Sequence, residues 1–184
     1  MYRRISFSVF LLLTSVIGLA DDPPATEWIT DPWGSLFIVV SQGRSEPMSI
    51  GSYSLLVYQN NRDAFITGTV GSRNGTVAGT WFDDLDDDGQ PEAVVWIRNA
   101  GSGGYGELQV YTLDQVRLER IVLPEPNFEL ISDYRGRDKF SMQNGSIYRT
   151  FPRYRANDSM AEPTGGEIRL KLDFAGRRWL EAAN

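Results

Sequence analysis

The chain of 184 residues contains no cysteine and no histidine. Without cysteine it can form no disulfide, so an exported domain of this composition must be stabilised by packing alone. Without histidine it lacks the side chain that most often acts as general base or binds transition metals. Lysine occurs only at Lys139 and Lys171. These absences exclude the nucleophile and base pairs that need cysteine or histidine.

Long hydrophobic runs are also missing, except at the N-terminus. Arg3 and Arg4 precede an apolar core, and Gly18-Leu19-Ala20 supplies the small residues of a cleavage site. This core is shorter than the roughly 20 residues that cross a bilayer. We therefore expect residues 1–20 to be an export signal cleaved near Ala20. The mature chain is expected to be periplasmic, with no membrane span.

A basic surface is absent as well. The chain has 18 lysines and arginines against 24 aspartates and glutamates, and removal of the signal takes two arginines with it. The 16 remaining basic residues against 24 acidic ones give the mature chain a net charge of −8. Nucleic acid is therefore excluded as a partner class, whereas basic proteins would be attracted.

The rest of the chain alternates short β-rich runs with turns, which predicts an all-β, antiparallel β-sandwich of short strands joined by hairpins. Residues 21–48 are interpreted as a tail with one candidate strand at 36–40, and residues 49–184 as the sandwich domain. Asn74-Gly75 and Asn144-Gly145 predict tight hairpin turns. The expected strands are 52–58, 64–70, 76–82, 93–99, 107–112, 117–122, 139–142, 146–151 and 167–174. The residues expected to point into the core include Val94, Trp96, Leu108 and Val110.

An acidic turn precedes the strand expected at 93–99. Its alternating oxygen-bearing side chains followed by Gly89 are typical of the first half of a calcium loop. The bidentate glutamate of an EF-hand is missing, because the twelfth position from Asp84 is Val95. A structural Ca²⁺ ion and a turn closed only by its own aspartates remain two open interpretations. The candidate ligands are Asp84, Asp86, Asp88, Gln90 and Glu92.

A glycine-rich loop follows the same strand and carries two hydroxyl groups, on Ser102 and Tyr105. Glycine lets a backbone take conformations that other residues avoid, so the loop can be thin and can present donors into a narrow acidic cleft, such as that of a glycosidase. The alternative is an ordinary wide hairpin turn. A catalytic serine is disfavoured, because no histidine exists and nothing places Lys139 or Lys171 near Ser102.

Three arginines alternate with aromatic residues near Arg149. Arg149, Arg153 and Arg155 lie among Tyr148, Phe151 and Tyr154. This pattern favours a strand with one solvated arginine face and one buried aromatic face, with anion or glycan binding as the alternative.

From about residue 50 to the C-terminus the chain resembles the periplasmic inhibitors of invertebrate-type (i-type) lysozyme. The segments that carry this resemblance are Gly51-Ser52-Tyr53-Ser54, the acidic turn before Glu92-Ala93-Val94-Val95-Trp96, Ser102-Gly103-Gly104-Tyr105-Gly106, Tyr134 to Phe140, Arg149-Thr150-Phe151-Pro152 and Pro163-Thr164-Gly165-Gly166. No counterpart is identified for residues 21–47.

The resemblance implies a non-enzymatic inhibitor that defends bacterial cell walls by inserting a loop into the lysozyme's active-site cleft. The implied inhibitory loop is Ser102, Gly103, Gly104, Tyr105 and Gly106, and we add Arg98 as a candidate contact at the cleft rim. The expected partner is lysozyme, with the i-type favoured by the resemblance. The other lysozyme classes stay open as alternatives, because their inhibitors carry a similar loop. No cofactor is expected beyond a candidate structural Ca²⁺, and the chain would be a monomer or homodimer. The alternative function is a calcium-dependent β-sandwich module that binds surface glycans or proteins.

Overall fold

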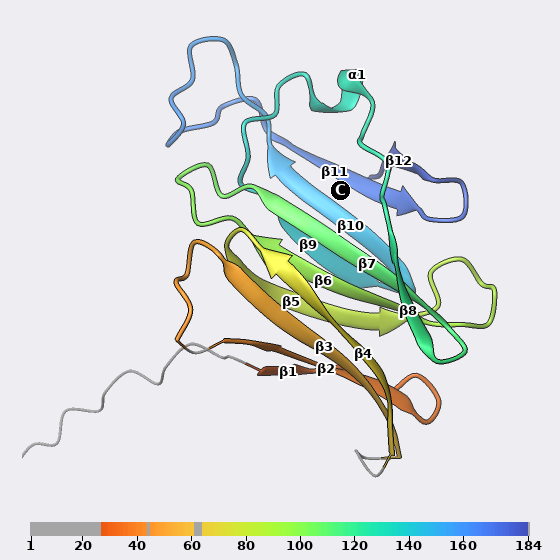
Figure 1. The fold of residues 1–184 in the computed structure, drawn as a ribbon. Helices are drawn as coiled ribbons and strands as arrows, with labels where there is room; N and C mark the ends of the chain where they lie inside the picture. The colour runs from red at the N-terminus through yellow and green to blue at the C-terminus, as the bar shows by residue number, and fades with distance from the viewer. Residues whose placement is uncertain (1–26, 44, 61–63, 184) are drawn as a thin grey trace, which may run out of the picture.

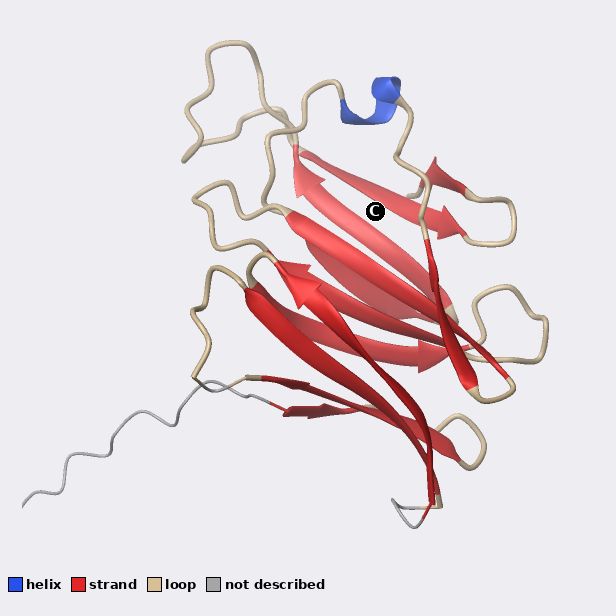
Figure 2. Ribbon diagram, in the orientation of Figure 1, coloured by secondary structure: helices blue, strands red, loops and turns tan. Residues whose placement is uncertain are grey.

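The computed structural model describes residues 27–43, 45–60 and 64–183, so the predicted signal at 1–20 lies outside the described residues. The described residues form strands and one helical turn, arranged in three four-stranded antiparallel sheets (Figures 1 and 2). The predicted all-β, antiparallel class is therefore confirmed. Across the described part of the chain, no helix has the length and apolar character needed to cross a membrane.

The first sheet has the order β1-β2-β3-β4 and includes the segment that the sequence analysis interpreted as a tail. Its strands are β1 (Glu27–Ile29), β2 (Leu36–Gln42), β3 (Gly51–Gln59) and β4 (Ala64–Arg73). The strand expected at 36–40 is β2, and it pairs with β3 over its whole length. The short strand β1 was not anticipated, because three residues give too little alternation to recognise.

The central sheet has the order β5-β6-β7-β8 and is covered on both faces. Its strands are β5 (Thr76–Asp83), β6 (Glu92–Arg98), β7 (Gly106–Asp114) and β8 (Arg117–Ile121). Strand β6 is buried at nearly every position, which explains its unbroken apolar sequence from Ala93 to Ile97. The expected core residues Val94 and Val110 are fully buried, and Trp96 and Leu108 pack partly buried against the same core.

The third sheet has the order β12-β11-β10-β9 and follows the one helix of the described chain, α1 (Phe128–Ile131). Its strands are β9 (Lys139–Gln143), β10 (Ser146–Pro152), β11 (Glu167–Asp173) and β12 (Arg178–Glu181). Figure 1 shows the three sheets stacked, with the central sheet between the other two. The sandwich thus has a third layer that the strand pattern alone did not indicate.

Two hydrophobic cores hold the layers together, one on each face of the central sheet. The first core joins Leu55 and Val57 of β3 to Val95 and Ile97 of β6. The second joins the opposite face of the central sheet, including Val94, to the third sheet. Burial of apolar side chains on both sides contributes about 25 cal/mol per Å² removed from water, which replaces the stabilisation that disulfides give to smaller exported domains.

The two predicted asparagine-glycine hairpins have different outcomes. Asn144-Gly145 joins the paired strands β9 and β10, and both residues have the positive φ that a two-residue hairpin turn requires. Asn74-Gly75 is not a hairpin turn, so that prediction is wrong. The chain passes there from the first sheet to the central sheet, because β4 pairs with β3 and β5 pairs with β6. The buried Arg73 guanidinium stabilises this corner by donating to the Gly75 carbonyl oxygen at 2.5 Å.

Candidate functional site

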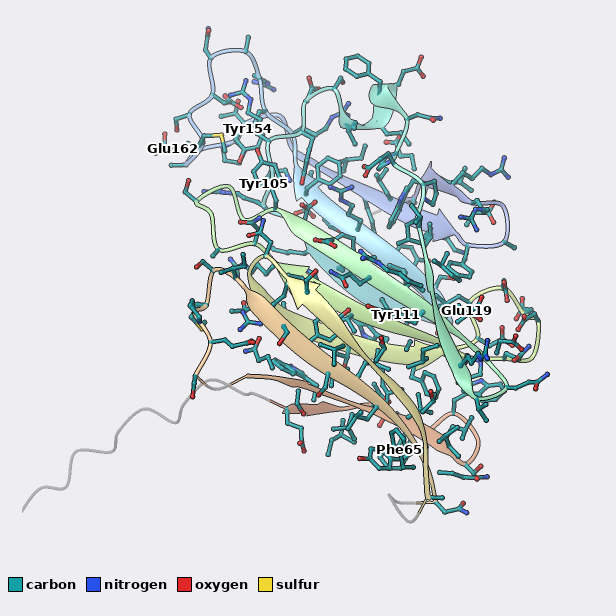
Figure 3. The ribbon with its side chains drawn as sticks, in the orientation of Figure 1. Phe65, Tyr105, Tyr111, Glu119, Tyr154 and Glu162 are labelled. Atoms are coloured by element: carbon teal, nitrogen blue, oxygen red, sulfur yellow. The ribbon has the colours of Figure 1, made fainter. Side chains whose placement is uncertain are left out.

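The glycine loop, residues 99–105, connects β6 to β7. In Figure 1 it projects from the same end of the molecule as the connection between β2 and β3 and the connection between β10 and β11, residues 153–166. Figure 3 labels Tyr105 at this end, with Tyr154 and Glu162 of the latter connection near it in the view. Three loops, one from each sheet, therefore lie at this end of the molecule.

Hydrogen bonds within the glycine loop give it a defined shape. The Gly101 amide donates to the Asn99 side-chain oxygen at 2.8 Å, and the Gly104 amide donates to the Gly101 carbonyl oxygen at 3.0 Å. The Asn99 amide closes the base of the loop by donating to the Tyr105 carbonyl oxygen at 2.8 Å. Gly104 has φ +57°, which side-chain-bearing residues rarely adopt. The loop is therefore a compact turn and not an open coil.

The two hydroxyl groups of the loop are available to a partner. Ser102 is exposed and Tyr105 is 45% exposed. Among the residues that the structure describes, none forms a hydrogen bond with either hydroxyl. Gly103 is buried beneath the Tyr105 ring, and a Cβ atom at this position would overlap that ring. The ring can therefore lie over the loop only if residue 103 is glycine.

Arg98 ends β6 beside the loop, and its side chain is exposed. No ion pair within the described part of the chain includes its guanidinium. Arg98 thus lies where a rim contact was predicted, although a contact with a partner stays a prediction.

A segment distant in sequence, residues 134–138, lies against the glycine loop. The Arg137 amide donates to the Gly103 carbonyl oxygen at 2.7 Å, and the Asp138 amide donates to the Gly104 carbonyl oxygen at 3.1 Å. In the opposite direction, the Gly106 amide donates to the Asp138 carboxylate at 2.7 Å. Three hydrogen bonds therefore join the loop to this segment, which the sequence had singled out only as part of the family resemblance.

Asp138 is the centre of a buried polar cluster. It is 4% exposed, and its second carboxylate oxygen accepts a hydrogen bond from Nε of Arg149 at 2.8 Å. The Tyr134 hydroxyl donates to the oxygen that also accepts from Gly106. Burial, reinforced by the Asp138 charge, raises the pKa of Tyr134. Burial alone would lower the pKa of Arg149, but the hydrogen bond and charge of Asp138 outweigh it and raise that pKa.

Aromatic rings extend this cluster to the tip of the loop. The Tyr105 ring meets the Tyr134 ring edge to face, with centroids 5.7 Å apart, and Tyr134 meets Phe151 in the same manner at 4.7 Å. The Arg149 guanidinium lies 4.8 Å from the centroid of Tyr134. Such contacts favour fixed ring orientations. Tyr105 is thereby supported from the third sheet.

The position of Arg149 corrects the predicted solvated arginine face. Arg149 is only 9% exposed and shares the buried face of β10 with Ile147 and Phe151. The prediction is wrong for this residue because a buried carboxylate, Asp138, neutralises it from a distant segment. Arg155 is exposed, as expected.

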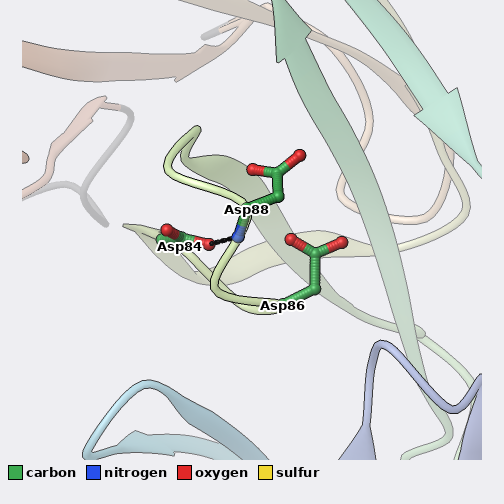
Figure 4. Close-up of side chains that lie close together, drawn as sticks. All are labelled: Asp84, Asp86 and Asp88. Atoms are coloured by element: carbon green, nitrogen blue, oxygen red, sulfur yellow. Dashed lines mark hydrogen bonds between the residues drawn. The ribbon is translucent and has the colours of Figure 1, made fainter.

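The acidic turn lies at the other end of β6. Oxygen atoms of Asp84, Asp86 and Asp88 lie within 4.8 Å of one another (Figure 4). Asp84 also accepts hydrogen bonds from the amides of Asp88 at 3.2 Å and Gly89 at 2.8 Å. The structure thus brings three of the five candidate calcium ligands together and shows that Asp84 closes the turn. Calcium binding stays a prediction.

Of the other two candidate ligands, Glu92 does not join that group of carboxylates. The Gln90 amide donates to Asp88 at 2.8 Å. Glu92 is 1% exposed, and its carboxylate accepts from the Leu85 amide at 2.9 Å and from the Thr112 hydroxyl at 3.2 Å. Burial, assisted by the charge of Asp86, raises the pKa of Glu92 to about 7. Glu92 therefore links the turn to the central sheet.

The fold and the site together define an all-β protein that presents a supported glycine loop at one end. In the described part of the chain, the two hydroxyl groups of this loop have no hydrogen-bond partner, and no hydrogen bond connects Ser102 with either lysine. Residues 26–129 match the family model described as periplasmic lysozyme inhibitor of I-type lysozyme. The chain belongs to this family. It is therefore an inhibitor of I-type lysozyme and not an enzyme, and its family is periplasmic by description.

Two solved structures from Aeromonas are similar to the chain. The crystal structure of PliI-Ah, the periplasmic lysozyme inhibitor of I-type lysozyme from Aeromonas hydrophyla, is 33% identical, covers 52% of this chain and 85% of its own, and has a TM-score of 0.47. Aeromonas hydrophila PliI in complex with Meretrix lusoria lysozyme is 37% identical, covers 47% of this chain and 74% of its own, and has a TM-score of 0.43. No curated protein matches the chain.

The matched range differs from the range over which the resemblance was drawn. It begins at residue 26 and so includes β1 and β2, for which no counterpart had been identified. It ends at residue 129, before Tyr134 and before the whole third sheet. The likeness of the later segments therefore lies outside the match. The residues that contact the glycine loop from behind belong to this additional part of the chain.

Proposed function

We propose that the chain inhibits i-type lysozyme by inserting residues 102–106 into the active-site cleft, where Ser102 and Tyr105 donate hydrogen bonds to the catalytic carboxylates. The observation that carries this proposal is a loop of fixed shape whose two hydroxyl groups have no hydrogen-bond partner among the described residues. Ionised carboxylates accept hydrogen bonds, and glycosidases usually use two of them.

The glycines of the loop support insertion into a narrow cleft. Gly103 lies beneath the Tyr105 ring, and Gly104 adopts a left-handed conformation that brings the chain back towards β7. Because neither residue has a side chain, the loop adds little width beyond its backbone. Arg98, exposed beside the loop, is suited to an acidic group at the cleft rim.

Charge supports the choice of partner. The mature chain, cleaved near Ala20 in the proposed scheme, carries a net charge of −8 and would be steered towards a basic enzyme. The complex of the Aeromonas hydrophila protein with Meretrix lusoria lysozyme agrees with a lysozyme partner. Residues 1–20 lie outside the described part of the chain, so the cleavage site is part of the proposal.

The alternative function, a calcium-dependent module for glycans or proteins, has less support. Family membership favours inhibition. In addition, Arg149, one of the three arginines of the candidate glycan or anion surface, is buried against Asp138.

The test is an inhibition assay with Ser102→Ala and Tyr105→Phe, using i-type, c-type and g-type lysozymes on bacterial cell walls. Loss of a buried donor to a charged acceptor should weaken i-type inhibition by about 1–3 kcal/mol, or about 5- to 150-fold, for each variant. Thermal unfolding should be unchanged, because neither hydroxyl has an internal partner in the described structure.

The matched controls are Ser35→Ala, in the turn between β1 and β2, and Tyr58→Phe, on β3. Both should inhibit as the wild type does. If Ser102→Ala and Tyr105→Phe also inhibit like the wild type, insertion of this loop is rejected. Equal inhibition of all three lysozyme classes would reject the i-type preference.

A further inference from the structure

We infer that segment 134–138, together with Arg149, is a clamp that holds the glycine loop in its inhibitory shape. This inference rests on the proposed function and assigns positioning residues for it. The clamp lies outside the range that matches the family, which ends at residue 129.

The hydrogen bonds of the clamp act on the backbone of the loop from both sides. Two amides of segment 134–138 donate to the carbonyl oxygens of Gly103 and Gly104, and the Asp138 carboxylate accepts from the amide of Gly106. The bonded positions surround Tyr105 in sequence. With donors and an acceptor fixed on both sides of this residue, the loop cannot shift without losing several hydrogen bonds together.

The shape of segment 134–138 brings it within reach of the loop. Gly136 has φ +102° and Arg137 has φ +64°, so the chain turns sharply here. A Cβ atom at Gly136 would overlap the Gly103 carbonyl oxygen. Glycine at position 136 is thus required by the close approach of two backbones.

Asp138 connects the clamp to the core. A carboxylate that is 4% exposed needs a full set of partners, and Asp138 obtains them from Arg149, Tyr134 and Gly106. Only the last of these belongs to the loop hairpin, whereas Arg149 lies on β10 in the third sheet. The third sheet therefore fixes the carboxylate, and the carboxylate fixes the start of β7.

The side chains of the clamp also reach the connection between β10 and β11. Arg137 donates to the Ala161 carbonyl oxygen at 3.1 Å, and Arg135 donates to the Asp158 carbonyl oxygen at 3.0 Å. Asp158 in turn accepts from the amides of Arg155 and Thr164, both at 2.7 Å. Segment 134–138 is therefore held between two ordered loops and does not depend on the glycine loop alone.

The first test is Gly136→Ala, which pushes on the Gly103 carbonyl oxygen and leaves the Asp138–Arg149 pair intact. Its matched control is Gly89→Ala, because Gly89 also has a positive φ, +87°, but a Cβ atom there would meet nothing within 4 Å. We expect Gly136→Ala to weaken i-type lysozyme inhibition about tenfold or more, as misplacement of a preorganised group does. Gly89→Ala should inhibit like the wild type.

A second variant, Asp138→Asn, removes the charge that holds Gly106, Tyr134 and Arg149. We expect faster hydrogen exchange at the Gly106 amide and weaker inhibition. Because this variant also disturbs a buried pair, its inhibition is compared at a temperature where circular dichroism shows it to be folded. The exchange rate reports the loop directly, which a general loss of stability would not do selectively.

A double-mutant cycle separates positioning from stability. In a Ser102→Ala background, Gly136→Ala should weaken inhibition by a smaller factor than in the wild type, because the clamp acts through the loop. If Gly136→Ala inhibits as strongly as the wild type while Ser102→Ala inhibits more weakly, the clamp is rejected and the proposed function stands. If Ser102→Ala and Tyr105→Phe both inhibit as strongly as the wild type, the proposed function is rejected, and with it the role of the clamp in inhibition.

Discussion

Strand β6 has a candidate functional loop at each end, the acidic turn before it and the glycine loop after it. The two loops differ in which residues form the hydrogen bonds that hold them. The acidic turn before β6 is closed largely by itself, with Asp84 accepting from Asp88 and Gly89. The glycine loop after β6 is held in addition by segment 134–138, more than 30 residues further along the chain, for example Gly106 to Asp138 with a separation of 32. A turn that satisfies its own backbone needs no partner to keep its shape. A loop supported from outside can leave its hydroxyl groups free for another molecule.

The largest effect that distinguishes the two loops is expected from Gly103→Ala. Its Cβ atom would overlap the Tyr105 ring, so the ring must leave its place against Tyr134. We expect inhibition of i-type lysozyme to weaken by about 10- to 100-fold, equivalent to about 1.4–2.8 kcal/mol. The inhibition constant measures this, and a variant that inhibits normally would show that the ring position is unimportant.

The next effect concerns pH and belongs to the acidic turn. Glu92 has a folded-state pKa of about 7 against an ordinary value of 4.5, so the folded state binds its proton more tightly. The resulting stabilisation is complete below about pH 4.5, decreases as pH rises, and is lost above about pH 7. Glu92→Gln should therefore be more stable than the wild type at pH 8 by about 1–2 kcal/mol, and no more stable at pH 4.5.

Chemical unfolding of both proteins across this pH range measures the difference. Thr112→Val serves as a control for the hydrogen bond that Glu92 accepts, because it leaves the carboxyl group in place. A stability difference that does not change with pH would contradict the raised pKa of Glu92.

A smaller effect is expected from Asp84→Ala. The amides of Asp88 and Gly89 would lose their acceptor, and each exposed hydrogen bond contributes about 0.5–1.5 kcal/mol. Because water can replace an exposed acceptor, we expect a loss of about 1 kcal/mol in the free energy of unfolding. Inhibition should be unchanged. Weaker inhibition by this variant would show that the two ends of β6 are coupled, contrary to our expectation that the acidic turn and the glycine loop act independently.

Calcium should have the smallest effect. Three carboxylate oxygens within 4.8 Å repel one another, and a divalent cation would relieve this repulsion. We expect millimolar Ca²⁺ to raise the thermal unfolding midpoint slightly and to leave the inhibition constant unchanged. Asp86→Asn is the matched variant, and it should reduce the calcium response. Inhibition that disappears with a chelator would instead support the calcium-dependent binding module.

Much of the fold follows from local patterns. The expected strand at 107–112 corresponds to β7, and that at 167–174 corresponds to β11, each within two residues at either end. The Asn144-Gly145 turn is correct because its two strands have each other as partners. The Asn74-Gly75 turn failed because its strands join different sheets, and a two-residue signal cannot report which partner a strand selects over a longer length.

The candidate site likewise has one part that could be predicted from the sequence and one part that could not. The glycines and hydroxyl groups of residues 102–106 could be recognised from the sequence because they are adjacent. The pairing of Asp138 with Arg149 could not, since neither residue type is expected to be buried and each is buried only because the other is present. The one local signal was Gly136 between two arginines in a segment without strand character. It indicated a turn but not which backbone the turn approaches.

By itself, the sequence determined that this protein is an all-β, acidic, cysteine-free chain with a hydroxyl-bearing glycine loop beside a buried strand. These properties depend on composition, on the alternation of side chains and on the conformational freedom of glycine, all of which are local. Only the tertiary structure decided that a third sheet covers the central one and that Asp138 reaches the loop from that side. Such contacts depend on how distant segments pack together, because a buried charge is stable only where another part of the chain supplies its partners.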